Sequence, residues 1–140
     1  MFNLSAPYNG FRKLTHNNSP LVLDIVDTCC LTGIFQIAGK HYFRLKPHGS
    51  FADYVTTIDN FCESRCQNYT RALSSDDGVL IKIPYRYKKY EVSYEDGANS
   101  GNIKQGNIIN CSITVIGIFS TQNITTCAFK LTSIRNKVPI

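Results

Sequence analysis

The strongest constraint on the fold is a regular alternation of apolar and polar residues in two neighbouring segments, 108–120 and 125–134. Side chains two residues apart lie on the same face of a β-strand, so each segment is predicted to be a strand with one buried face. The turn-prone residues Thr121, Gln122 and Asn123 lie between the segments and predict an antiparallel pair. The residues expected on the buried face are Ile109, Cys111, Ile113, Val115, Cys127, Phe129 and Leu131.

Earlier segments also have the composition of strands. Residues 21–30 are predicted to form the first strand, and residues 31–47 a hairpin that turns at Gly39-Lys40. Residues 79–85 and 89–95 are predicted to form two more strands around a turn. In the second arm of the first hairpin, alternation separates two faces, one with His41, Phe43 and Leu45 and the other with Tyr42, Arg44 and Lys46.

Residues 50–73 break the strand pattern. Apolar residues recur there at intervals of three and four, which predicts one amphipathic helix near 51–73. Ser50 is the predicted N-cap, with Asp53 three residues later. One helix among many strands predicts a mainly β fold. The favoured form is a small β-barrel of the oligonucleotide-binding (OB) type, and a β-sandwich is the alternative.

The chain of 140 residues has the length of one domain. We expect an irregular N-terminal arm over residues 1–20, which are polar and rich in turn formers, and a β-barrel over residues 21–135. The longest apolar runs are too short to span a bilayer, and the first residues lack the apolar core of a signal peptide. We therefore expect an intracellular protein without membrane contact, with its six cysteines reduced and structural.

Motifs for catalysis are absent from the sequence, which contains no GxSxG, HExxH, Walker A or GxGxxG pattern. We therefore predict a non-enzymatic protein with no catalytic residues and no cofactor. Cys62 and Cys66, one helical turn apart, suggest structural zinc as an alternative, but a strong zinc signature needs a second short pair, so we predict no metal site. Further ligands for such a site would come from His41, His48, Cys29 and Cys30.

Cations and aromatic residues are interleaved on both earlier strand pairs, in a chain with a net charge of +5. Proteins that bind single-stranded nucleic acid need this combination, because cations follow the phosphates and aromatic rings stack on the bases. Edge lysines and half-buried tyrosines of an ordinary sheet would produce the same pattern, and that interpretation stays open. The residues predicted to bind nucleic acid are Lys40, Tyr42, Arg44, Lys46, Lys82, Arg86, Tyr87, Lys88, Lys89, Tyr90 and Lys130.

Residues 90–135 contain the strand YEVSYEDG, a polar loop, the run GNIINCSITVIGIF and the final AFKLTSIR. This third of the chain resembles the end of small OB-fold single-stranded-DNA-binding proteins of large double-stranded DNA viruses. In such proteins the last strand pair often carries a tryptophan or another aromatic residue, whereas this pair offers only Phe119 and Phe129. The resemblance implies a protein that coats displaced DNA strands during viral replication or recombination, in the host nucleus or cytoplasm, with homo-oligomer formation left open.

Two other function classes stay open. A capsid-associated structural protein, built as a β-sandwich, would have a similar composition and would present an apolar patch to its neighbours. A host-directed viral binding protein would be glycosylated at sequons such as those that begin at Asn17, Asn68, Asn110 and Asn123. It would also contain oxidised cysteine pairs, for which Cys111 and Cys127 are one candidate.

Overall fold

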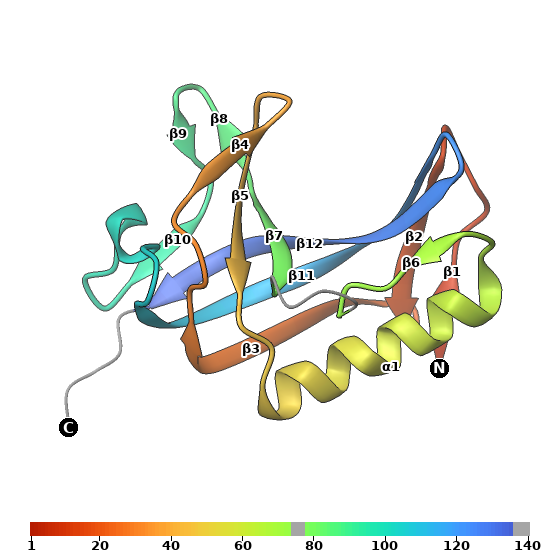
Figure 1. Cartoon of the computed structure of the whole chain (residues 1–140), viewed down its shortest axis with the longest axis horizontal. Helices are drawn as coiled ribbons and strands as arrows, with labels where there is room; N and C mark the ends of the chain where they lie inside the picture. The colour runs from red at the N-terminus through yellow and green to blue at the C-terminus, as the bar shows by residue number, and fades with distance from the viewer. Residues whose placement is uncertain (74–77, 136–140) are drawn as a thin grey trace.

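The computed structural model describes residues 1–73 and 78–135, and within them the chain is mainly β with one α-helix, as predicted (Figure 1). The helix is α1 (Gly49–Arg65), and a short 3-10 helix, η1 (Ser100–Asn102), follows later. The strands are β1 (Phe2–Leu4), β2 (Phe11–His16), β3 (Ser19–Cys29), β4 (Phe35–Ile37), β5 (Lys40–Leu45), β6 (Tyr69–Thr70), β7 (Val79–Ile83), β8 (Tyr85–Arg86), β9 (Lys89–Tyr90), β10 (Ser93–Glu95), β11 (Ile108–Thr121) and β12 (Ile124–Arg135).

Five strands form the central part of one mixed sheet, in the order β3, β11, β12, β7, β5. Neighbours along this path are antiparallel except β12 and β7, which are parallel. The sheet curls until the end of β5 meets the end of β3. There Leu31 N–H donates to the Arg44 carbonyl and Lys46 N–H donates to the Cys29 carbonyl. Pairing between β3 and β5 is limited to this end, so the sheet is a partly open barrel.

The core lies inside the curl. Alternate residues of β5, β7, β11 and β12 point inward, as the sequence pattern predicted, and α1 runs along one side of the sheet (Figure 1). Burial of each large apolar side chain stabilises the fold by about 1.5 to 3 kcal/mol relative to exposure. Among the described residues, the largest fully buried side chains include Phe43, Leu45, Ile58, Ile81, Ile83, Ile113, Phe129, Leu131 and Ile134.

Strand β11 changes its partner half-way along. Its first part pairs with β3, whereas Gly117 to Phe119 pair with β2, and a bulge between Val115 and Gly117 bends the strand between the two parts. Gly117 has a φ of 151°, and a Cβ at this position would lie 2.3 Å from the carbonyl oxygen of Arg12. Glycine is therefore required where β2 crosses β11.

The expectation of an irregular arm over residues 1–20 is wrong. This part forms β1, β2 and the start of β3, and Leu14 is buried in the core. The turn-rich dipeptides mark tight turns between strands rather than an unstructured segment. Asn17 and Asn18 both have positive φ, of 52° and 64°, which is the geometry that asparagine tolerates in a two-residue hairpin turn.

The helix is shorter than the predicted range of 51–73, because it ends at Arg65. Asp59, which is buried on α1, accepts hydrogen bonds from the Tyr69 hydroxyl at 2.7 Å and from the backbone N–H of Ala72 at 2.9 Å and Leu73 at 3.1 Å. The chain therefore folds back onto its own helix and contributes β6. The predicted N-cap, Ser50, is also wrong. His48 occupies the N-cap position of α1, and its side chain makes no capping hydrogen bond.

The predicted strand over residues 89–95 is divided. After β7 the chain forms a separate two-stranded hairpin from β8 and β9, and then β10, which pairs with β12. Pro84 separates β7 from β8, and it lacks the N–H that a continuous strand would use. The side-chain alternation shifts there, so Tyr85 is 46% exposed and Tyr87 is 78% exposed rather than buried with Ile83.

Candidate functional site

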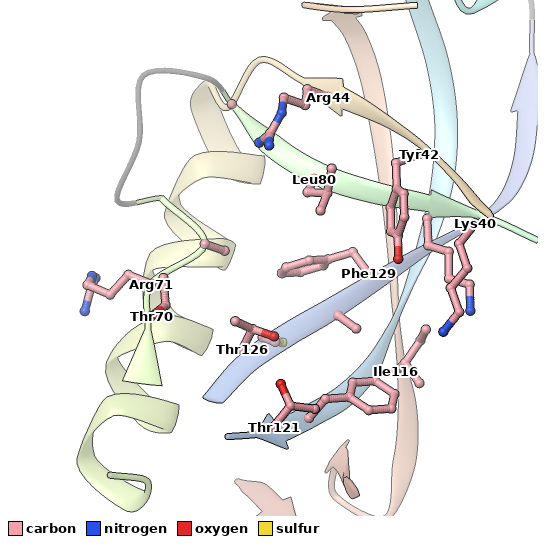
Figure 2. A pocket seen from close by; sticks show the side chains of 16 residues that line it. Lys40, Tyr42, Arg44, Thr70, Arg71, Leu80, Ile116, Thr121, Thr126 and Phe129 are labelled. Atoms are coloured by element: carbon pink, nitrogen blue, oxygen red, sulfur yellow. The ribbon is translucent and has the colours of Figure 1, made fainter. Parts of the chain in front are cut away.

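The outer surface of β5 and β7 borders a groove with a volume of about 620 Å³, which is within the range of ligand sites, roughly 300 to 1,000 Å³. The strand pattern explains its chemistry. Because alternate residues of β5 fill the core, Lys40, Tyr42 and Arg44 point outward and line the groove. Figure 2 shows these three side chains along one side and the hydroxyls of Thr121 and Thr126 on the other.

A row of side chains crosses the sheet beside this groove. Tyr42 of β5 lies opposite Lys82 of β7, and Lys82 lies opposite Lys130 of β12. Adjacent strands are about 4.8 Å apart, so Lys82 is an immediate neighbour of both Tyr42 and Lys130. Lys40 precedes Tyr42 by two residues and therefore points to the same face. Sheet register thus gathers cations from three strands that are distant in sequence.

Four cations at this groove form no ion pair with a described carboxylate. Among residues 1–73 and 78–135, no ion pair within 4.0 Å involves Lys40, Arg44, Lys82 or Lys130. Partial burial lowers the pKa of Lys82 below its ordinary value, and the positive charges of Lys40 and Lys130 lower it further. Without an anion, the repulsion between these cations is unfavourable. Their surface is therefore a candidate anion-binding site.

Three aromatic residues line the groove besides the cations; Phe129 is buried, whereas Tyr42 and Phe119 are more accessible. The Tyr42 ring is half-buried, with its centroid 6.3 Å from that of Phe35. Phe119 is 40% exposed and packs on Phe11 at a centroid distance of 4.7 Å. Sequence reasoning did not place Phe119 among the contact residues. The sequence feature that could have indicated its position is Gly117, which marks the bend where β11 crosses β2.

The far rim of the groove comes from the segment after α1. Thr70, Arg71 and Ala72 line it, and the hydrogen bonds to Asp59 hold this segment against the helix. Arg71 lies 3.4 Å from Glu63, and Figure 2 shows its guanidinium directed away from the groove. The sequence pattern assigned this segment to the helix, so its part in the groove was not predicted.

The structure brings together only part of the predicted binding surface. Lys40, Tyr42, Arg44 and Lys82 line the groove, and Lys130 lies beside Lys82. The exposed Lys46 follows β5 and does not line the groove. The remaining residues belong to the separate hairpin of β8 and β9, namely Arg86, Tyr87, Lys88, Lys89 and Tyr90.

The hairpin carries the same residue types in a different setting. Tyr87 and Lys88 form its turn with φ values of 53° and 62°, and the Arg86 guanidinium lies 5.0 Å from the centre of the Tyr87 ring. At its base, the Tyr90 hydroxyl hydrogen-bonds with Nδ1 of the buried His41 at 3.0 Å. Burial raises the pKa of the Tyr90 phenol. Tyr90 is thus a structural anchor, whereas Tyr87 is exposed.

No protein-family model, curated protein or solved structure matches this chain. Within the described part of the chain, no helix is long and apolar enough to cross a membrane.

All six cysteines are free in the structure. Cys111 lies opposite Ile134 and Cys127 opposite Ile118, so these two cysteines are far apart along β11 and β12 and do not form the pair considered above. Burial raises the pKa of Cys30 to about 11 and that of Cys111 to about 12, which suits core thiols rather than reactive ones. The described residues also contain no group of three His, Cys, Asp or Glu side chains that would hold a metal ion.

Proposed function

We propose that this protein binds single-stranded nucleic acid in the groove on the outer face of β5 and β7, and that it does so without catalysis. The observation that carries this proposal is the row of Tyr42, Lys82 and Lys130 across three adjacent strands, with Lys40 and Arg44 beside it and no acidic partner among the described residues. The cations follow the phosphates, and the aromatic rings stack on the bases.

Stacking favours a single strand over a duplex. In a duplex the bases are paired and stacked on one another, so only their edges reach a protein. In a single strand the faces of the bases are open to aromatic side chains. Tyr42 and Phe119 offer such rings inside a concave groove, next to the cations. A site for duplex backbone alone would not need aromatic rings at this position.

The fold agrees with this function. The strands β3, β5, β7, β11 and β12 make a partly open five-stranded barrel. OB-folds are barrels of this kind, and they bind oligonucleotides on the face of their second and third strands and at the loop between the fourth and fifth. In chain order, the groove lies on the second and third of these five strands, and it includes Thr121 at the turn between the last two.

On these grounds, together with the resemblance of residues 90–135, we propose single-stranded DNA as the ligand. The role would be to coat strands displaced during viral replication or recombination. Such binding weakens steeply as salt concentration rises, because every phosphate contact releases counterions.

The test is fluorescence anisotropy with a labelled 30-nucleotide oligothymidine at several salt concentrations, with duplex DNA as competitor. We expect salt-sensitive binding that duplex DNA displaces poorly. Lys82→Met removes one charge from the groove and should weaken binding, whereas Lys104→Met removes an exposed charge that does not line the groove. Absence of binding at low salt, or equal weakening by both variants, would contradict the proposal.

A further inference from the structure

The three lysines Lys40, Lys82 and Lys130, named here the lysine cluster, occupy neighbouring positions on one face of the sheet. Lys82 is central, because Lys130 lies directly opposite it on β12 and Lys40 lies diagonally from it on β5. Diagonal neighbours on adjacent strands are about 7 to 8 Å apart at Cα, which long lysine side chains easily span. Three ammonium groups can therefore reach one ligand group together.

Such a cluster has a cost in the absence of a ligand. Like charges on directly opposite strand positions destabilise a sheet. In the described part of the chain no carboxylate forms an ion pair with any of the three lysines. Burial is the main reason that the pKa of Lys82 is lowered, and the positive charges of Lys40 and Lys130 lower it further, as repulsion between like charges predicts.

The charge of the cluster exceeds that of one internal phosphate. A phosphodiester within a strand carries a single negative charge, whereas a phosphomonoester carries about −1.5 to −2 at pH 7 and has three strong acceptor oxygens. Three ammonium groups match the three acceptor oxygens of the phosphomonoester, and their charge of about +3 is balanced better by a phosphomonoester than by a phosphodiester. At the other end of β5, Arg44 is a single cation of the groove and matches an ordinary phosphodiester.

Building on the proposed function, we infer that the lysine cluster binds a phosphomonoester and that Tyr42 stacks on the base beside it, so that the protein prefers phosphorylated ends of single strands. The groove then receives the strand in a defined position. Arg44 lies at the other end of β5 from Lys40, four residues or roughly 13 Å away (Figure 2). It contacts a phosphate further along the nucleic-acid strand.

The phosphomonoester has two sources, a strand end or a free nucleoside monophosphate. Competition distinguishes them. The labelled 30-nucleotide oligothymidine is displaced by unlabelled eight-nucleotide oligothymidines that carry a 5′-phosphate, a 3′-phosphate or neither, and by thymidine 5′-monophosphate. We expect one phosphorylated oligonucleotide to compete about tenfold better than the unphosphorylated one, and the free nucleotide to compete more weakly than that oligonucleotide.

Variants test which residues cause the preference. Lys130→Met keeps the apolar stem of the side chain and removes its charge, so the phosphorylated oligonucleotide should lose about tenfold in affinity and the unphosphorylated one much less. Arg44→Met should weaken both oligonucleotides equally. Lys104→Met is the control and should change neither. Circular dichroism and thermal unfolding check that each variant is folded.

Every outcome bears on one of the two proposals. Equal competition by all three oligonucleotides, with the 30-nucleotide strand still bound, overturns the preference for ends and leaves the proposed function standing. Equal competition by thymidine 5′-monophosphate and the phosphorylated oligonucleotide overturns the assignment to strand ends. Failure of the 30-nucleotide strand to bind at low salt overturns both.

Discussion

Two regions of this chain have the same mixture of cations and tyrosines, and the fold uses them differently. On β5 and β7 the residues stand on strands whose other face fills the core, so register fixes their spacing and a groove forms between them. In the β8–β9 hairpin the two strands pair at only two positions, and the exposed Tyr87 lies in the turn. Composition therefore identifies candidate surfaces, whereas a concave site depends on the scaffold behind it.

The largest effect is expected from removing the support of the groove rim. Asp59→Ala leaves the Tyr69 hydroxyl and the N–H groups of Ala72 and Leu73 without their acceptor. An unsatisfied buried donor costs about 1 to 3 kcal/mol, and these three donors are partly buried, so the free energy of unfolding should fall by about 3 kcal/mol. Urea unfolding measures the loss. Asp53→Ala, an exposed position on the same helix, should stay within about 0.5 kcal/mol, and a similar change in both variants would show that the rim does not depend on Asp59.

The next effect compares equal charge losses in the two regions. Lys82→Met with Lys130→Met should weaken binding of the 30-nucleotide strand about 50-fold at low salt, and should reduce the salt slope by about 1.4 for the loss of two cations that neutralise phosphate charge. Lys88→Met with Lys89→Met removes the same charge from the hairpin and should weaken binding about threefold at most. Anisotropy titrations over a range of salt concentrations measure both. Equal losses would mean that net charge, rather than the groove, determines affinity.

A smaller effect is expected from the aromatic rings. Tyr42→Ala removes a ring that lines the groove and should weaken binding about tenfold, since stacking on one base contributes about 1 to 3 kcal/mol. Tyr42→Phe keeps the ring and should bind nearly as the native protein does. Tyr87→Ala removes a more exposed ring and should change affinity less than about twofold. A larger loss for Tyr87→Ala than for Tyr42→Ala would reverse the assignment of the site.

Local patterns predicted the strands and their faces well, because alternation is a local property. His41, Phe43 and Leu45 of β5 are buried as expected. So are Ile109 and Ile113, which share one face of β11. The end of α1 was not predictable in this way. Tyr69 and Leu73 continue the helical spacing, yet they meet the helix through a chain reversal that Asp59 stabilises, and this contact is tertiary.

The groove itself depends on strand order, which no local pattern contains. Lys130 was expected on the same surface as Lys82, but that the two are directly opposite follows from the parallel pairing of β7 with β12. Phe119 enters the groove because β11 bends at Gly117 and crosses β2. In contrast, the hairpin residues could be grouped from the sequence alone, because their neighbours in space are also their neighbours in the chain.

The smallest effect is expected at the junction of the two regions. Tyr90→Phe removes the hydroxyl that bonds to Nδ1 of His41 at 3.0 Å but keeps the ring packed against Tyr85 and His41. The free energy of unfolding should fall by about 0.5 to 1.5 kcal/mol, which is the usual net contribution of one hydrogen bond, and affinity for the 30-nucleotide strand should change less than twofold. Urea unfolding and anisotropy measure the two quantities on the same preparation.

If affinity falls strongly while stability is unchanged, the Tyr90 hydroxyl contacts the ligand, and the hairpin belongs to the binding surface. If stability falls and affinity does not, Tyr90 only anchors the hairpin, and the groove on β5 and β7 is sufficient for binding.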